Sequence, residues 1–501
     1  MSEFLIANMA PIIFASMVVF LLVGFPVSFA LAANGIFFGL IGIELGLLGP
    51  QLFQALPDRI FGIMSNDTLL AIPFFTFMGL ILERSGMAED LLDTIGQLFG
   101  PLRGGLAFAV ILVGALLAAT TGVVAASVIS MGLISLPIML RYGYDKKLAS
   151  GVIAASGTLA QIIPPSLVLI IMADQLGKSV GDMYAGAFVP GLTLTVFYVG
   201  YVVLVAIFRP RWVPALPSEA RTLRGAKLLL RVLTTLVPPL MLIFLVLGTI
   251  FLGIATPTEG GAMGATGALI MALVRRRLSW GLLKQAMETT AKLTTFVVFI
   301  LVGARVFSLT FYGVDGHKWV EHLLTGLPGG EIGFLIVVNV LVFLLAFFLD
   351  FFELSFIVVP LLGPVAQALG IDLIWFGVLL AVNMQTSFMH PPFGFALFYL
   401  RSVAPASVKS TDIYWGAIPF VCIQIIMVGI LIVFPQLVTL GLDKEEKVDL
   451  DAVKIEMPTS DYGTPTAPSP ADLQDKPTGS PEGTDDAGKA VLEALKRDSG
   501  K

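Results

Sequence analysis

The sequence is poor in charge, in cysteine and in histidine, and each shortage excludes a class of protein. Only 13% of its 501 residues are charged while 56% are hydrophobic, which is far from the composition of soluble domains. The single cysteine, Cys422, excludes an intramolecular disulfide and a cysteine metal cluster, and we expect it to be a small core residue. Three histidines without the HExxH spacing leave metal catalysis without support.

Long apolar runs are what the sequence has in abundance. They recur from Phe4 to Leu440 with only short polar breaks. A helix needs about 20 apolar residues to cross a bilayer, and about a dozen runs suit that requirement. Because lipid offers no partner for backbone amides and carbonyls, unalternating runs of this kind form helices rather than barrel strands. We therefore predict an all-α polytopic membrane protein with about a dozen transmembrane segments in a lipid bilayer.

The two ends of the chain differ in character. Met1 to Asn8 contains no Lys or Arg, so we expect the first segment to remain a membrane helix rather than a signal peptide. Residues 441–501 hold 14 acidic and 8 basic side chains, against 21 acidic and 22 basic in the rest. The near-neutral body carries no basic field for nucleic acid, so no such partner is expected. The last part is rich in Pro, Ser, Thr and Gly, and we expect a disordered acidic tail over 441–501.

A basic loop at 209–231 separates a first membrane half, 1–208, from a second, 232–440. The loop holds six basic side chains and one acid, so the positive-inside rule places it in the cytoplasm. Arg275, Arg276 and Arg277 form a second basic anchor two predicted spans later. Two spans are an even number, so both anchors should lie on the same side of the membrane.

Matched prolines indicate that the two halves are internal repeats. Three prolines of the first half recur 227 positions later: Pro137, Pro164 and Pro165 match Pro364, Pro391 and Pro392. Downstream, DMYAGA from Asp182 matches DIYWGA from Asp412 at an offset of 230, so a short insertion reconciles the two offsets. The joint pattern predicts a duplication, and spacing alone leaves open whether the copies are inverted.

Paired prolines break an apolar helical run in each half, giving one hairpin at 149–173 and another at 374–400. Proline removes an amide donor and frees upstream carbonyls. Broken helices at matched places in two repeats are typical of transporter sites, where carbonyls and hydroxyls hold sodium and half-helix N-termini hold an anion. The simpler alternative is a pair of kinks without a ligand. The polar candidates are Ser156, Thr158 and Ser166 in the first hairpin and Asn383, Gln385, Thr386 and Ser387 in the second.

Four ionisable residues in apolar surroundings have competing interpretations. Asp350 and Glu353 are three apart and can share a helical face as functional acids, or can lie at an interface and face water. Glu259 follows Thr256 and is better explained as the acidic first turn of a capped helix. His390 has no neighbouring carboxylate, so a packed histidine at a helix break is favoured over a proton carrier.

At this point the chain resembles a known family, the large membrane subunit of tripartite ATP-independent periplasmic (TRAP) transporters. The resemblance covers nearly all of residues 1–440 and rests on AIPFFTFMG, GGLA, ASGTLAQIIPPS, ATPTEGGA and the second PP segment. It implies a scaffold domain and a moving, elevator-type transport domain built from inverted repeats with two re-entrant hairpins. It also implies sodium coupling, a small membrane subunit and a soluble substrate-binding protein.

By the same resemblance, particular positions carry over to the sodium and substrate sites. In the first hairpin these are Gly157, Thr158, Pro164, Pro165 and Ser166; in the second they are Asn383, Thr386, Pro391, Pro392 and Gly394. Ser156 and Gln385 join the candidate sites on the polarity of their side chains alone. Thr120, Thr121 and Gly122 resemble the polar break that contributes to a sodium site. His390 departs from the family, because many relatives have Thr before the second PP, so a threonine ligand is missing there.

The sequence therefore predicts a permease of the bacterial or archaeal inner membrane that imports a small organic acid with sodium. The solute would come from a periplasmic binding protein, with no cofactor and no metal beyond sodium. A stand-alone ion-coupled carboxylate carrier is the alternative within transport. An intramembrane enzyme would need a nucleophile and base or paired acids, and no HExxH, GxSxG or phosphate loop occurs. A channel fits repeat-related broken helices less well than alternating access.

Overall fold

The computed structural model describes residues 2–121, 124–347 and 349–442, so Gly122 and the expected acidic tail lie outside the described residues. Within the described ranges the regular structure is helical, without a strand, which confirms the predicted all-α class. The helices of the first half are α1 (Ser2–Ala7), α2 (Met9–Leu22), α3 (Val27–Glu44), η1 (Pro50–Ala55), α4 (Leu56–Met64), η2 (Asp67–Leu70), α5 (Ala71–Arg84), α6 (Met87–Phe99), α7 (Gly105–Thr121), α8 (Val124–Arg141), α9 (Lys146–Thr158), η3 (Leu159–Gln161), α10 (Leu167–Leu176) and α11 (Val180–Phe208).

A short helix, η4 (Pro210–Trp212), begins the connection to the second half. The helices that follow are α12 (Gly225–Phe251), α13 (Pro257–Val274), α14 (Trp280–Gly313), α15 (Gly316–Thr325), α16 (Gly330–Leu345), α17 (Phe351–Ile357), α18 (Val359–Ala368), α19 (Leu373–Ser387), α20 (Phe395–Val403), α21 (Ser410–Val433) and α22 (Gln436–Thr439). Helix α12 begins at Gly225, inside the stretch 209–231 that was predicted to be a loop. Its first turns are polar but carry Leu228, Leu229 and Leu230, which suit a helix that continues beyond the apolar span.

Six of these helices are long and apolar enough to cross a membrane, and nine segments qualify if each of three bent helix pairs counts as one. The remaining apolar helices of 10–17 residues include α10 and α19, which carry the paired prolines on their connecting loops. A helix rises 1.5 Å per residue, so α10 covers about half of a bilayer core. The dozen apolar segments predicted from sequence thus divide into full spans and shorter, broken pieces.

The two halves repeat in the same register at the junctions that lead into the hairpins. Helices α8 and α18 end at Arg141 and Ala368, and helices α9 and α19 begin at Lys146 and Leu373, each pair 227 positions apart. Both junctions use the pattern Gly-x-Asp: the glycine is left-handed (φ +83° and +77°), and the aspartate side chain caps the next helix. A left-handed glycine ends a helix and an aspartate starts one, so the same residues at the same offset produce the same turn.

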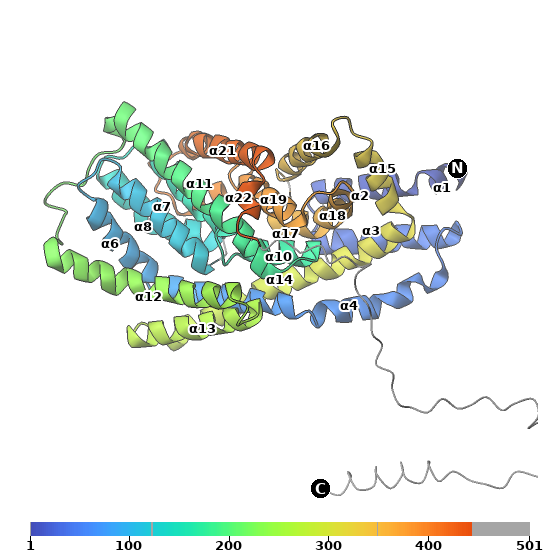
Figure 1. Ribbon diagram of the computed structural model, residues 1–501, viewed down its shortest axis with the longest axis horizontal. Coiled ribbons are helices and arrows are strands. Elements are labelled where there is room, and N and C mark those ends of the chain that lie inside the picture. Colours follow the sequence, from blue (N-terminus) through green and yellow to red (C-terminus); the bar gives the residue numbers. More distant parts are fainter. Residues whose placement is uncertain (1, 122–123, 348, 443–501) are drawn as a thin grey trace, which may run out of the picture. The chain divides into compact units, whose positions relative to one another are not determined.

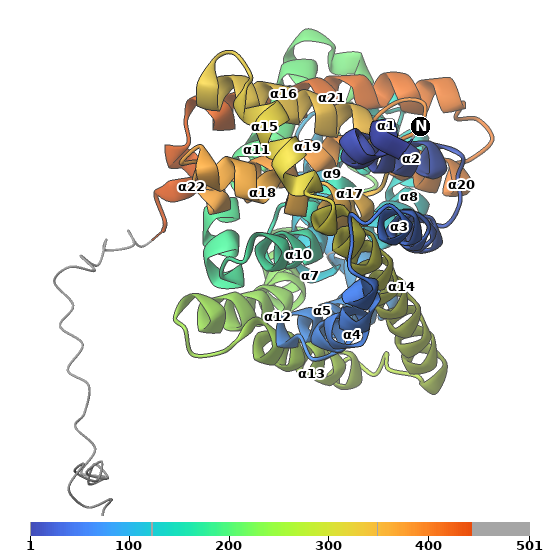
Figure 2. The ribbon, with the colours of Figure 1, turned by 90° about the vertical axis from the view of Figure 1, so that its right-hand side faces the viewer.

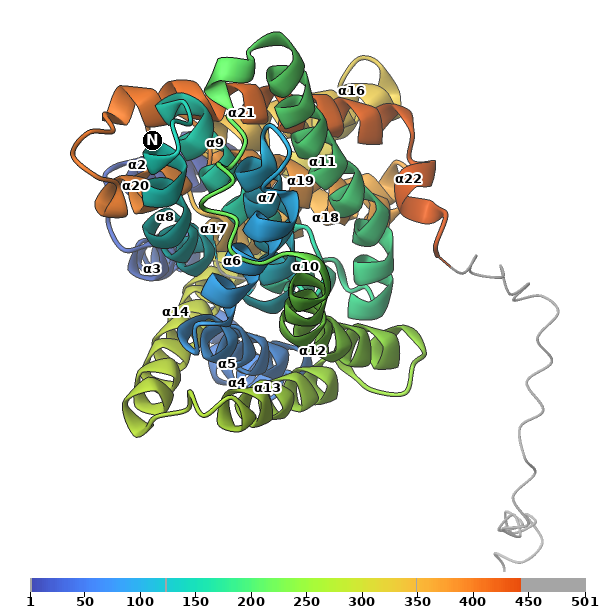
Figure 3. The same cartoon turned by 90° about the vertical axis from the view of Figure 1, so that its left-hand side faces the viewer.

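The repeats pack reciprocally against each other. Helices α3 and α13 are 230 positions apart; α3 packs on α14 of the second half, and α13 packs on α5 of the first. Figures 2 and 3 show both pairs side by side. Close approach depends on glycines, because a Cβ on Gly35 would lie 2.7 Å from the Val306 carbonyl and one on Gly261 would lie 3.0 Å from Phe74 Cβ. Two repeats related by an approximate two-fold axis contact each other in this way, because each repeat offers the same helix to the other.

Helices α10 and α19, which lie next to the paired prolines in the sequence, are at the centre of the helix bundle (Figure 1). Every residue of α19 is buried, as is every residue of α9 from Leu148 onward. A helix buried all round is hydrophobic all round, which explains why neither helix shows an amphipathic pattern in the sequence. Cys422 was expected in this core, but it is exposed on α21, because it falls on the face of that helix turned away from the bundle.

The two basic anchors predicted to share one side of the membrane do meet. Asp90 on α6 accepts ion pairs from Arg231 at 3.2 Å, Arg275 at 3.5 Å and Arg277 at 3.0 Å. The start of α12 and the end of α13 therefore lie together, as two consecutive spans require. Glu259 forms a capping box with Thr256 at the start of α13, which confirms its interpretation as a helix cap.

Candidate functional site

The first hairpin consists of α9, the short η3 turn, the Pro164–Pro165 break and α10. Its three hydroxyls are buried and donate to nearby carbonyls: Ser156 to Val152, Thr158 to Ala155 and Ser166 to Gln161, at 2.6–2.8 Å. Ser166 also accepts the Val168 amide at 3.2 Å and so caps α10. A hydroxyl that donates one hydrogen bond keeps oxygen lone pairs free to coordinate a cation.

The second hairpin consists of α19, the Pro391–Pro392 break and α20. At the end of α19, Thr386 and Ser387 donate to the carbonyls of Asn383 and Met384 at 2.6 and 2.5 Å. Asn383 donates to both the carbonyl (2.8 Å) and the side-chain oxygen (3.0 Å) of Asn339 on α16.

The tip of this hairpin is tightly folded around Gly394. The Gly394 amide donates to the His390 carbonyl at 2.6 Å. A Cβ on this glycine would lie 2.6 Å from the Phe388 carbonyl, so the turn accepts no side chain here. Such close backbone approach explains why a glycine follows the second proline pair.

His390 lies in an aromatic cage next to the second proline pair. Its ring centroid is 4.1 Å from that of Phe343 and 4.3 Å from that of Phe347, and the residue is 2% exposed. Neither ring nitrogen has a hydrogen-bond partner among the described residues. The structure thus supports the packed interpretation of His390 and shows no carboxylate beside it.

A buried polar bridge joins the two hairpins. Thr158 Oγ1 accepts the Gln385 side-chain amide at 3.1 Å, and these two residues are 227 positions apart, the offset of the repeat. Equivalent residues touch each other only near a symmetry axis, so the axis relating the repeats passes close to this bond. Gln424 on α21 also points its amide at Thr158 Oγ1 (3.5 Å) and donates to the Tyr198 hydroxyl on α11 (2.9 Å).

A cavity of about 250 Å³ lies where the broken helices meet. Four pairs of its lining residues are separated by 227 positions: Val124 and Phe351, Ala125 and Phe352, Gln161 and Phe388, Val168 and Phe395. The cavity therefore straddles the same approximate axis. Leu293 and Phe296 of α14 close it on one side, and Asp350 and Tyr399 add polar atoms.

The two halves contribute unequally to this cavity. The first repeat provides aliphatic side chains and Gln161, whose buried Oε1 atom has no partner in the part of the chain that the structure describes. The second repeat places phenylalanine at each of the four equivalent positions. One wall is therefore aromatic, and the facing wall leaves room for a solute.

The predicted acids take part in a helix cap next to this cavity. The Asp350 carboxylate accepts the Glu353 amide at 3.0 Å, and the Glu353 carboxylate accepts the Asp350 amide at 2.9 Å. This capping box starts α17 and accounts for both residues locally. Asp350 also lines the cavity, so its charge acts on whatever the cavity holds.

Among the predicted site residues, the structure joins Thr158 to Gln385 and places Asp350 in the cavity lining, while the lining does not include the other candidates that the structure describes. Thr120 and Thr121 end α7, while Gly122 lies outside the described residues. Four polar residues were missed as site candidates: Gln161, Tyr198, Asn339 and Gln424. Each is a polar side chain inside an apolar run, which was the available signal, but only the fold shows which partner it reaches. The described residues contain no group of three or more His, Cys, Asp or Glu side chains suited to a metal.

Comparison with known proteins shows the family to which this chain belongs. The family model described as "Tripartite ATP-independent periplasmic transporter, DctM component" matches residues 14–437. The chain belongs to this family. It is therefore the large membrane subunit of a TRAP transporter, a multi-pass protein of the inner membrane, and its family members are named as permeases rather than enzymes.

Its relatives within the TRAP family carry different solutes in their names. The C4-dicarboxylate TRAP transporter large permease protein DctM of Pseudomonas aeruginosa is 31% identical, covering 79% of this chain and 91% of that protein. The ectoine/5-hydroxyectoine TRAP transporter large permease protein UehC of Ruegeria pomeroyi is 28% identical (86% and 97%). The sialic acid TRAP transporter permease protein SiaT of Haemophilus influenzae is 25% identical (77% and 61%).

The fold also occurs in a solved transporter. The YdaH transporter of Alcanivorax borkumensis superposes with a TM-score of 0.53, covering 77% of this chain and 88% of that protein at 16% identity. At this identity the likeness concerns the fold. It agrees with a membrane transporter architecture for the TRAP large subunit.

Proposed function

We propose that this chain imports a small organic acid together with sodium, as the permease subunit of a transporter that also contains a small membrane subunit and a periplasmic binding protein. The observation that carries the proposal is the cavity between the broken hairpins, at which several helices begin. The first residues of α8, α10 and α20 line it: Val124, Leu167 and Phe395. Helix N-termini carry partial positive charge and free amides, which favour an anion such as a carboxylate.

The other ends of the broken helices suit a cation. Helices α9 and α19 end at Thr158 and Ser387, and their last carbonyls point toward the breaks. Carbonyl and hydroxyl oxygens are the ligands that hard cations prefer, and half-helix C-termini coordinate sodium in transporters built from repeats. We assign sodium to the hydroxyls and carbonyls at these ends, together with the predicted Thr120–Gly122 segment.

The aromatic wall of the cavity suits the carbon skeleton of the solute. Phe351, Phe388 and Phe395 offer apolar surface, while Gln161 offers an unpartnered oxygen and Asp350 a carboxylate that disfavours a second negative charge nearby. A solute with one carboxylate and a short apolar body satisfies these surroundings. The carboxylate would face the helix N-termini, and the carbon skeleton would face the rings.

Uptake into proteoliposomes tests the function. The vesicles would contain this chain and its small subunit, with the binding protein outside and a panel of radiolabelled organic acids. We expect uptake that needs both the binding protein and an inward sodium gradient, and that stops when choline replaces sodium. Sodium-dependent uptake without the binding protein would support the stand-alone carrier, and solute-independent currents would support a channel.

We further propose that the hairpin-bearing helices move against a scaffold formed by α3, α5, α13 and α14. Leu293 on α14 belongs to the scaffold, Tyr399 on α20 belongs to the hairpin-bearing helices, and both residues line the cavity. In a Cys422→Ser background with Leu293→Cys and Tyr399→Cys, a bifunctional methanethiosulfonate that spans the cavity should join the two helices and stop uptake until a reductant is added. Unchanged uptake after complete cross-linking would contradict movement between these helices.

A further inference from the structure

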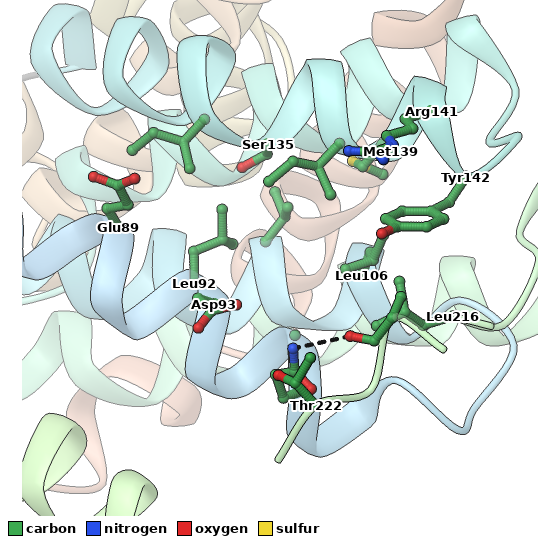
Figure 4. Close-up of a pocket in the computed structure, with 16 residues that line it drawn as sticks. Glu89, Leu92, Asp93, Leu106, Ser135, Met139, Arg141, Tyr142, Leu216 and Thr222 are labelled. Carbon is green, nitrogen blue, oxygen red and sulfur yellow. Dashed lines mark hydrogen bonds between the residues drawn. The ribbon is translucent and has the colours of Figure 1, made fainter. Parts of the chain in front are cut away.

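A second cavity, of about 460 Å³, lies away from the broken hairpins. Helix α6 forms one wall, α7 and α8 form another, and the connection around Leu216 and Thr222 closes it (Figure 4). Its lining comes from one half of the protein and the basic connection, so the transport cavity described above does not include it. The positive-inside rule puts this connection, and hence the cavity, on the cytoplasmic side.

Acceptor atoms dominate the wall formed by α6. Glu89, Asp93 and Gln97 follow one another at four-residue intervals, so they share one face of the helix and all line the cavity. The Gln97 Nε2 atom donates to the Ala220 carbonyl at 3.2 Å, and its buried Oε1 atom has no partner within the described ranges. This helix face therefore presents two carboxylates and an amide oxygen to the same space.

The carboxylates on this face have no cation of their own among the described residues. Asp90, three residues before Asp93 on α6 and not part of the cavity lining, takes the ion pairs with Arg231, Arg275 and Arg277. No ion pair or side-chain hydrogen bond occurs at Glu89 or Asp93 within the described ranges. The three arginines therefore pair with Asp90, and Glu89 and Asp93 remain carboxylates without an ion pair among the described residues.

A buried hydroxyl on the facing wall provides an independent sign of a ligand. Ser135 on α8 is 2% exposed and lines the cavity, and its Oγ atom has no hydrogen-bond partner among the described residues. Figure 4 shows Ser135 between Glu89 at one end and Arg141 at the other. An unpaired buried hydroxyl costs about 1–3 kcal/mol unless something pairs with it, and most buried polar atoms are paired.

We propose that this cavity binds an amphipathic amine. The ammonium group would pair with the carboxylates of Glu89 and Asp93 and donate toward the Ser135 hydroxyl. The apolar body would lie on Leu92, Val110 and Ile138, which line the same space. Arg141 also lines the cavity, but it lies at the end away from Glu89 (Figure 4). At the α6 wall an anion would meet two unpaired carboxylates, so a cationic head is the chemistry that this wall selects.

Two sources share this chemistry: an aminophospholipid whose headgroup enters from the membrane, and a soluble amphipathic amine from the cytoplasm. The location between α6 and α8 is open to both. The binding assay therefore uses one probe from each source.

The experiment measures thermal unfolding of the delipidated full chain in neutral detergent while 4-phenylbutylamine is titrated. We expect a saturable rise in the unfolding midpoint, with the uncharged 4-phenylbutanol giving none. Replacing both carboxylates, Glu89→Gln with Asp93→Asn, should weaken amine binding by about ten- to a hundredfold, because charge-assisted hydrogen bonds are lost. Glu288→Gln on α14 is the matched control, since it removes an exposed carboxylate elsewhere and should leave binding unchanged.

The lipid source is tested by native mass spectrometry with phosphatidylethanolamine and phosphatidylglycerol. Retention of phosphatidylethanolamine that displaces the amine assigns the site to the lipid, while amine binding without competition assigns it to a soluble ligand. Ser135→Ala should weaken the amine less than the carboxylate replacements do. Equal binding of the alcohol and the amine, or no loss in the carboxylate variant, would overturn the proposal, and so would binding of neither probe.

Discussion

The bond between the hairpins allows a sharp test of the repeat symmetry. Thr158→Val keeps the shape of the side chain and removes the hydroxyl that accepts the Gln385 amide at 3.1 Å and the Gln424 amide at 3.5 Å. Both glutamines are fully buried, so water cannot replace the lost acceptor. Gln424 keeps the Tyr198 hydroxyl as a partner, whereas Gln385 loses the only partner that its amide has in the described residues.

The expected cost follows from these contacts. Leaving one buried amide unpaired costs about 1–3 kcal/mol in proteins generally. Hydrogen bonds inside membranes average about 0.6 kcal/mol by double-mutant cycles, with a maximum of about 1.7. We therefore expect Thr158→Val to lower the free energy of unfolding by about 1–2 kcal/mol.

The matched control is Thr193→Val on α11. Its hydroxyl is exposed and donates only to the Val189 carbonyl of its own helix, so the change should cost less than about 0.5 kcal/mol. Reversible unfolding in mixed micelles gives both values, and a cycle with Gln385→Met isolates the pair. Coupling of at least about 0.5 kcal/mol is expected between the two sites. Equal losses at Thr158 and Thr193, or strict additivity with Gln385→Met, would refute the inter-hairpin bond.

Three further outcomes follow from the described contacts. Gly394→Ala should abolish uptake because its Cβ would lie 2.6 Å from the Phe388 carbonyl, whereas Gly429→Ala, with nothing within 4 Å, should leave uptake normal. Asp350→Asn should keep the helix cap, because asparagine also caps helices, but it removes a negative charge from the cavity. The KM for a carboxylate should therefore fall by about a few-fold. An unchanged or higher KM in uptake assays would contradict this prediction. Asp90→Asn should lower stability by about 1 kcal/mol, because its three partly exposed ion pairs are each weak, and the loss should shrink when choline chloride screens the charges. Thermal unfolding at low and high choline chloride measures how the stability loss in Asp90→Asn depends on salt. A loss that does not change with salt would contradict the prediction.

The sequence predicted where the helices break more accurately than it predicted which residues are buried around them. Pro164 and Pro391 mark both hairpins because proline cannot continue a helix, and this rule needs no tertiary information. The Gly-x-Asp junctions are equally local. Cys422 was misplaced because a helix that is apolar all round gives no sign of which face meets protein and which meets lipid.

Partners across the fold lay beyond the sequence for a similar reason. Gln161, Asn339 and Gln424 are polar residues in apolar runs, and nothing local says which residue each one reaches. The fold brings Gln424 to Thr158, 266 positions away, and Asn339 to Asn383. Such contacts depend on how helices from the two repeats pack together.

By itself the sequence determined a helical membrane protein of two repeats, each broken at a proline pair, because apolar length and proline chemistry act on the chain locally. Only the tertiary structure decided that Thr158 and Gln385 meet, that α8, α10, α17 and α20 begin around one cavity, and that among the described residues Asp90 takes the arginine ion pairs while Glu89 and Asp93 take none. These features arise from an approximate symmetry axis and from side-chain pairing between distant segments. Neither leaves a local pattern in the order of residues.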